Sequence, residues 1–185
     1  MAQFFQSVAS LESLFADLIA SITGLTPSKV LIGYEDEGIP NVSKQTDVCF
    51  LSVSIGTGGA VRGRQKTFVP ATNTSQSKFV YSQRSERIVK LSVTFYGPNC
   101  FENAVALNQK LYFDYNKLTL EKNHLGLIPD NTIGPTTLRE NHNGQWFKRC
   151  DLELDFYNML VVEDIVGVFD EIVIRKVDET DELAY

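Results

Sequence analysis

The sequence contains few of the residues from which catalytic and metal sites are usually built. Of its 185 residues only two are histidine, three are cysteine and one is tryptophan. His124 and His142 have no cysteines at zinc-ligand spacing, so we interpret both as surface histidines and expect no metal site. Cys49, Cys100 and Cys150 are odd in number and each lies beside apolar residues, so buried reduced thiols are favoured over disulfides.

Long apolar runs and an overall positive charge are also missing. No segment reaches the ~18 uninterrupted apolar residues of a membrane span. The N-terminal stretch lacks the positive start and apolar core of a signal peptide, so we expect a soluble, unexported chain with no membrane partner. The formal net charge of -6 argues against a whole-surface affinity for nucleic acid or anionic lipid, since both need a positive field. The net charge does not exclude a local basic patch.

What the chain does contain is the composition of one folded domain. Hydrophobic residues make up 43% and charged residues 22% of the chain, and a domain of this size buries roughly 70% of its unfolded surface. No internal repeat or composition shift divides it. We therefore predict a single α+β domain over residues 1–185, with an antiparallel or mixed sheet of four to six strands and two main helices packed on one face.

Hydrophobic periodicity locates the expected elements. Apolar residues recur at steps of three and four over 7–23, which predicts an amphipathic helix that ends at Gly24. The stretch 116–144 is predicted to be irregular, but Asn143-Gly144 suits a type I′ turn, so residues 138–141 are expected to pair back on the strand that follows. Alternating or continuously apolar stretches predict five strands: 30–32, 47–55, 87–96, 146–157 and 166–177.

The turn Gly97-Pro98-Asn99 joins a strand to a helix, where nucleotide-binding and hydrolase folds carry their chemistry. It has neither a glycine-rich phosphate loop nor a nucleophile serine. Gly97 allows the backbone to turn, Pro98 fixes φ, and Asn99 is predicted to cap the helix while Glu102 reaches back to its amide. Packing is favoured over catalysis for Cys100, although a helix N-terminus lowers a thiol pKa. The residues predicted to be buried on this helix are Ala104, Leu107, Leu111, Tyr115 and Leu118.

Charge is segregated along the chain. Residues 61–90 hold seven basic side chains against one acidic, and from Glu163 onward there are eight acidic against two basic. The glycine-rich, aperiodic stretch at about 56–78 is predicted to be a long flexible basic loop, and about 178–185 an acidic tail. This loop is either solvated or in contact with an acidic partner or phosphate, and base stacking is disfavoured because aromatic residues are not interleaved with its arginines.

Three acids alternate along one strand face, at Asp151, Glu153 and Asp155. Strand geometry brings alternate residues to about 6–7 Å from each other on one face, which resembles a metal ladder. No further ligand is indicated by the sequence. A solvated or salt-bridging face is therefore favoured.

Three stretches carry a resemblance to a known family. The series LSVTFYGPNCFENAVALNQKLYFDY, followed by QWFKRCDLELDFY and a closing VVEDIVGVFDEIVIRKVD, resembles the neck or tail terminator proteins of long-tailed bacteriophages. In that family a strand ending in a YGPN-like turn enters a helix with an asparagine, here Asn103, and a later strand carries an arginine, here Arg149. The resemblance covers roughly Ser85 to Asp178.

The resemblance implies a structural subunit with no catalytic residues and no cofactor. It implies a ring, commonly a hexamer, at the head-proximal end of the tail, which ends tube growth and leaves a channel through which DNA passes without sequence-specific binding. The implied partners are the tail tube and the neck and head-completion proteins, with the sheath as a further candidate. The implied location is the tail–neck region of the virion, after assembly in the host cytoplasm. Alternatives are another neck, head-completion or tail-tube subunit or, less favoured, a nucleic-acid-binding module acting through the basic loop; an enzyme ranks third.

A ring would give the segregated charge a use. In a head-to-tail interface one patch must complement a different patch on the neighbour, and the basic segment 62–90 with the acidic segment 163–182 supplies such a pair. The interface residues predicted on this basis are Arg62, Arg64, Lys66, Lys78, Arg84, Glu163, Asp164, Asp170 and Glu171.

Overall fold

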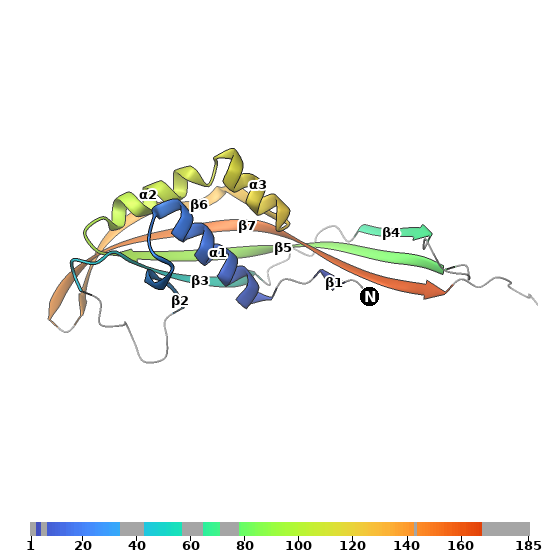
Figure 1. Ribbon diagram of the computed structural model, residues 1–185, viewed down its shortest axis with the longest axis horizontal. Helices are drawn as coiled ribbons and strands as arrows, with labels where there is room; N and C mark the ends of the chain where they lie inside the picture. Colours follow the sequence, from blue (N-terminus) through green and yellow to red (C-terminus); the bar gives the residue numbers. More distant parts are fainter. Residues whose placement is uncertain are drawn as a thin grey trace, which may run out of the picture.

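Two long antiparallel strands, β5 (Lys78–Tyr96) and β7 (Gln145–Gly167), form the centre of the fold. The structure, a computed structural model, describes residues 3–4, 7–33, 43–56, 65–70, 78–142 and 144–167. Within these ranges the chain forms one seven-stranded mixed sheet with α-helices on one of its faces (Figure 1), which confirms the predicted α+β class. The other elements are β1 (Gln3–Phe4), α1 (Val8–Thr23), the 3-10 turn η1 (Pro27–Lys29), β2 (Val30–Ile32), β3 (Val48–Gly56), β4 (Gln65–Pro70), α2 (Cys100–Lys110), α3 (Asp114–Lys122) and β6 (Leu125–His142).

The two central strands have different neighbours along their length. Residues 88–96 of β5 pair with β3, which in turn pairs in parallel with β2, and residues 145–158 of β7 pair with β6. Farther along, β5 pairs with β4 and β7 pairs with β1. We call the helix-covered part the body, and we call β1, β4, 78–86 of β5 and 159–167 of β7 the arm. The arm extends beyond the helices (Figure 1).

The core lies between the helices and one face of the body sheet. Alternate residues of β3, β5 and β7 point into it, as their period-two pattern predicts. The helix α1 begins with the Ser7 side chain as its N-cap and ends at Gly24, whose φ is 76°. It buries Phe15 against Phe156, with 5.0 Å between ring centroids. None of the helices in the described ranges has the length and apolarity needed to cross a membrane.

The sheet has more strands than the expected four to six. β4 lies inside the stretch predicted to be a flexible loop, and neither it nor the two-residue β1 is long enough to show a clear period. β6 fills most of the stretch 116–144 that was predicted to be irregular. Its pairing shifts register between Ile128 and Ile133 and again before Thr136, so bulges interrupt the alternation that would have revealed it.

β7 is also longer than predicted. It runs without a break from the predicted strand 146–157 into Val166 and Gly167, where a separate strand was expected to begin. The rest of that predicted strand, 168–177, and the predicted tail at 178–185 lie outside the described residues. The predicted hairpin is confirmed: His142 pairs with Gln145, and Gly144 has a φ of 76°.

The second predicted helix is two helices. Its buried stripe ends at Leu111, whereas Tyr115 and Leu118 are 57% and 51% exposed on α3. The break is stabilised by Asn116, which is buried and donates its Nδ2 to the Lys110 carbonyl oxygen at 2.7 Å. A polar side chain therefore takes the position that a continuous apolar stripe would give to a hydrophobic residue.

Candidate interaction surfaces

The strand-to-helix turn is held by Asp47, which lies before β3. Gly97 has a φ of 116°, and a Cβ added there would lie 2.4 Å from Asp47 Oδ1 and 2.8 Å from the Thr46 carbonyl oxygen. Only glycine fits this close approach. Asp47 in turn accepts the Asn99 amide on Oδ1 at 2.9 Å and the Asn99 Nδ2 on Oδ2 at 2.8 Å.

This geometry corrects the capping mechanism predicted for the turn. Asn99 is the N-cap residue of α2, but its side chain forms no cap hydrogen bond to the helix. Its own amide donates to Asp47 and not to Glu102. Asn99 thus fastens the Gly97-Pro98-Asn99 turn to the chain before β3, and Glu102 is an exposed first-turn acid.

The cysteines have the character of packed thiols. All three are free and buried, as predicted. Burial raises the pKa of Cys49, and it is the largest cause of the raised pKa values of Cys100 and Cys150. A raised pKa keeps the thiol protonated at neutral pH, which opposes the nucleophile interpretation of Cys100.

Two of the three alternating acids on β7, Asp151 and Asp155, form salt bridges, and Glu153 is exposed. Arg149 donates to Asp151 from Nε at 2.7 Å and from Nη2 at 2.8 Å, and also donates to Glu140 at 3.2 Å. The hydrogen bonds to Asp151 are the largest cause of the raised pKa of Arg149. The Lys90 Nζ lies 3.9 Å from Asp155 Oδ2. In the described part of the chain no three histidine, cysteine or carboxylate side chains gather as a metal site.

His124 lies at the junction of body and arm. It is exposed and has a φ of 55°, and its carbonyl oxygen accepts the Asn158 Nδ2 at 3.2 Å and the Met159 amide at 3.0 Å. Asn158 Oδ1 accepts from Arg87 Nε at 2.7 Å. Burial lowers the pKa of Arg87. The side chain of His142 lies outside the described residues.

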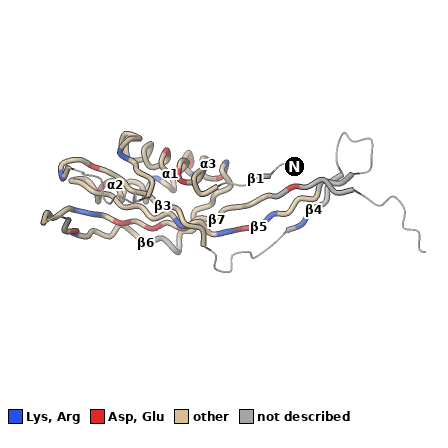
Figure 2. Tube along the Cα trace, turned by 90° about the horizontal axis from the view of Figure 1, so that it is seen from below, with Lys and Arg blue, Asp and Glu red and all other residues tan. Residues whose placement is uncertain are grey.

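The described interface residues predicted from charge all lie on the arm. Lys66 on β4 and Arg84 on β5 are exposed, and Glu163 on β7 is half-buried. Glu163 pairs with Ser82 of β5, so the basic and acidic segments adjoin within one chain (Figure 2). Lys78 and Asp164 belong to the arm strands, but their side chains lie outside the described residues, as do Arg62, Arg64, Asp170 and Glu171 entirely.

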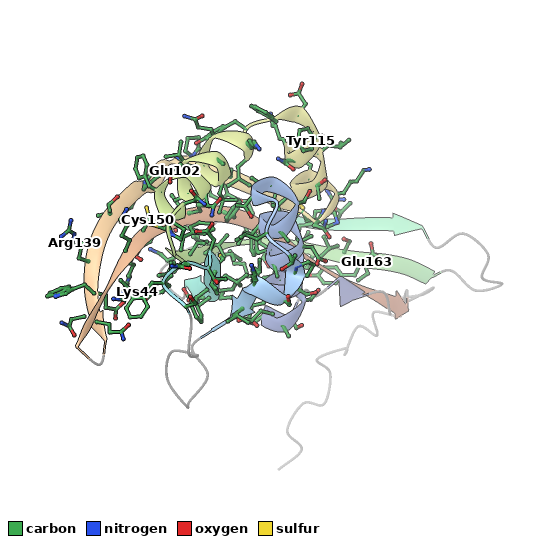
Figure 3. All side chains as sticks on the ribbon, turned by 60° about the vertical axis from the view of Figure 1, so that its left-hand side comes forward. Lys44, Glu102, Tyr115, Arg139, Cys150 and Glu163 are labelled. Atoms are coloured by element: carbon green, nitrogen blue, oxygen red, sulfur yellow. The ribbon has the colours of Figure 1, made fainter. Side chains whose placement is uncertain are left out.

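A second charged surface was not predicted. At the other end of the sheet, which we call the hairpin end, Arg139 and Lys148 are directly opposite each other on β6 and β7. The Lys44 Nζ lies 5.5 Å from the centre of the Phe147 ring, and Trp146 is 62% exposed. Figure 3 shows Arg139 and Lys44 at this end and Glu163 toward the arm. The only sequence feature that indicated the hairpin end was the Asn143-Gly144 turn.

The hairpin end also contains a pocket. It has a volume of about 240 Å³ and is lined by Lys44, Gly97, Pro98, Trp146, Phe147 and Lys148. β5 ends at Tyr96, opposite Arg149, so among the described residues β7 has no strand beside residues 145–148 on the side away from β6. Among the described residues the pocket therefore adjoins a strand edge that has no partner strand.

A third exposed surface is apolar. It covers the outer faces of α2 and α3, where large side chains stand in solvent and two of their rings, Phe113 and Tyr115, lie 6.1 Å apart. Contiguous exposed apolar patches are typical of interaction sites. The members of this helix patch are Phe101, Tyr112, Phe113, Tyr115 and Leu118.

Comparison with protein families identifies a match. Residues 9–180 match the family described as phage neck terminator protein. No curated protein matches the chain. The match covers nearly the whole sequence, including both central strands, α2, α3 and all of α1 but its first residue.

Proposed function

The chain belongs to the phage neck terminator proteins, and from this premise we propose that six copies form a ring at the head-proximal end of a phage tail. As a member of this family it is a structural component of the virion neck that interacts with other tail and neck proteins. In our proposal the ring ends growth of the tail tube, joins the tail to the neck and head-completion proteins, and leaves a channel for DNA. The whole chain acts as one domain and carries out no catalytic step.

The family match is the observation that carries this proposal, and the surfaces of the fold support it. The arm extends beyond the helices that cover the body, and a narrow β-ribbon gains stability from packing against another surface. The helix patch offers exposed aromatic side chains, which are enriched where proteins meet. A head-to-tail ring needs two different surfaces per subunit.

We assign the arm, with its predicted charged residues, to contacts with the neighbouring subunit or with the tube and neck proteins. Lys66, Arg84 and Glu163 are the described members of that set. DNA would pass without sequence-specific contact, and the net charge of -6 limits its retention.

The test is the oligomeric state together with the phenotype of a deletion phage. Native mass spectrometry and negative-stain images of the purified protein should show a closed ring. Electron microscopy of phage lacking the protein should show tails of uncontrolled length or tails detached from heads. Complete absence of tails would instead assign the protein to the tube, and a solitary particle at high concentration, absent from virions, would overturn the proposal.

A further inference from the structure

Among the described residues, the positive charge of Arg139 and Lys148 at the hairpin end is balanced by no ion pair. Arg139 and Lys148 are a like-charged cross-strand pair, an arrangement that destabilises a sheet unless an anion lies nearby. The nearest acids along the same two strands, Glu140 and Asp151, are both bound by Arg149. Among the described residues neither Arg139 nor Lys148 forms an ion pair.

The same surface has the apolar features of a protein-binding site. Trp146 is the only tryptophan of the chain and is mostly exposed. It lines the pocket with Pro98 and Phe147, beside the edge of β7 that no described strand covers. Exposed tryptophans in pockets are typical centres of binding energy, and open strand edges accept an added peptide strand.

We propose that the hairpin end binds the acidic segment 168–185 of a second copy of this chain. This inference deepens the proposed ring and rests on it, because it names one contact by which one subunit would hold the next. The segment has six acidic and two basic residues. Its last part combines Asp178, Glu179, Asp181 and Glu182 with Leu183 and Tyr185, which matches cations surrounding an aromatic pocket.

The length of the strands assigns the segment to another copy. Trp146 and Gly167 are separated by 21 residues of one continuous strand, or roughly 70 Å at ~3.3 Å per residue. Asp181 follows Gly167 by 14 residues, which span at most about 50 Å when fully extended. The two ends of the sheet lie at opposite ends of the molecule (Figure 1). The acidic residues therefore reach the hairpin end of a neighbour and not their own.

Nucleic acid fits this surface less well. The hairpin end offers three cations, Lys44, Arg139 and Lys148, on a chain whose net charge is -6. Specific protein–DNA interfaces usually bury larger and more strongly basic surfaces. An acidic peptide with apolar side chains would contact both the cations and the pocket of the hairpin end.

A peptide titration tests the docking directly. The acceptor is the full chain with Asp178→Asn, Glu179→Gln, Asp181→Asn and Glu182→Gln, whose own segment no longer competes, and the probe is a synthetic peptide of residues 168–185. Because the peptide has no tryptophan, the fluorescence of Trp146 reports binding. We expect saturable binding that weakens at least tenfold when Arg139→Glu and Lys148→Glu are added to the acceptor.

Matched controls separate the site from general charge attraction. Lys117→Glu with Lys122→Glu changes the net charge equally on the exposed face of α3 and should alter affinity less than twofold. A scrambled peptide should bind at least tenfold more weakly. The proposal would be overturned if the scrambled peptide bound as tightly as the peptide of residues 168–185. It would also be overturned if duplex DNA bound more tightly than the peptide of residues 168–185 at the same salt concentration.

Complementation distinguishes this contact from the ring itself. One variant keeps the acidic segment and carries Arg139→Glu with Lys148→Glu; the other keeps the hairpin end and carries the neutralised segment. In native mass spectrometry, the assembled fraction of each variant alone should be at least tenfold lower than that of the wild-type protein. A mixture of the two variants should form a one-to-one complex. Wild-type rings in both variants, together with no peptide binding, would reject the docking and leave the proposed function standing. A wild-type protein that forms no ring would reject the proposed function, and the peptide titration would then decide the docking alone.

Discussion

The strand β5 passes through two different environments. Between Val89 and Phe95 its alternate residues are buried beneath α1 and α2, opposite the buried residues of β3 and β7. Between Lys78 and Glu86 the same strand continues into the arm, where Arg84 and Glu86 are exposed. The backbone ladder to β7 is continuous through both parts.

This contrast separates stability from assembly. Apolar burial is the main favourable term in folding, and the large buried side chains of the described chain belong to the body. The arm has hydrogen-bonded strands without a helix layer. We therefore expect substitutions in the body to change the free energy of unfolding, and substitutions in the arm to change association.

The largest stability effect is expected from Phe156→Ala. Phe156 is fully buried and packs on Phe15, so truncation leaves a cavity that costs about 3–5 kcal/mol of unfolding free energy. Urea denaturation followed by circular dichroism measures this. Met159→Ala, three residues along β7 and 36% exposed in the arm, is the matched control and should cost below about 1 kcal/mol. Equal losses would erase the distinction between body and arm.

Gly97→Ala should have the next largest effect. The new Cβ would meet Asp47 Oδ1 and the Thr46 backbone, and alanine would be strained at a φ of 116°. Strain of this kind costs about 1–3 kcal/mol, and loss of the Asp47 bonds to Asn99 adds to it. Gly126→Ala, where a Cβ meets open space, is the control. The measurement is the urea midpoint, and a midpoint unchanged in Gly97→Ala would show that the turn relaxes freely.

Asn158→Ala tests the junction between the two regions. It removes the acceptor of Arg87 Nε and the donor to the His124 carbonyl oxygen. Loss of a buried hydrogen-bonding group costs about 1–3 kcal/mol. We also expect the Met159 amide to exchange with deuterium faster, because its acceptor His124 loses its second donor. Unchanged exchange at Met159 would mean that the arm is fastened to the body by other contacts.

Sequence patterns predicted the body well where each element obeys one period. The residues of α1, β3 and the inner half of β5 alternate or repeat regularly, and a cap or glycine ends the helix. Beyond the predicted hairpin at 138–141, β6 was missed because its bulges, near Pro129 and Pro135, remove the period on which the prediction depends. The break before α3 was missed because an apolar stripe continues through it, and only the buried contact of Asn116 reveals the turn.

The candidate surfaces were harder to predict because they depend on where neighbouring strands stop. The sequence indicated a strand at Trp146 and Lys148, but not that β5 ends opposite Arg149 and leaves them without a described strand on that side. It likewise indicated a cap at Asn99, while the actual acceptor, Asp47, lies 52 residues earlier. Long-range contacts of this kind leave no local pattern.

The smallest stability effect, and the sharpest test of the arm, is expected from Lys66→Glu combined with Arg84→Glu. Both side chains are exposed on neighbouring strands, with Gln65 paired to Arg84, so the unfolding free energy should change by no more than about 0.5 kcal/mol each. If the arm contacts a neighbour of opposite charge, however, two reversals convert attraction into repulsion, and the assembled fraction in native mass spectrometry should fall at least tenfold. Lys117→Glu with Lys122→Glu on α3 supplies the same charge change away from the arm. Equal assembly by both double variants would show that the arm charges face solvent, and the surface that joins the copies would then have to lie on the body.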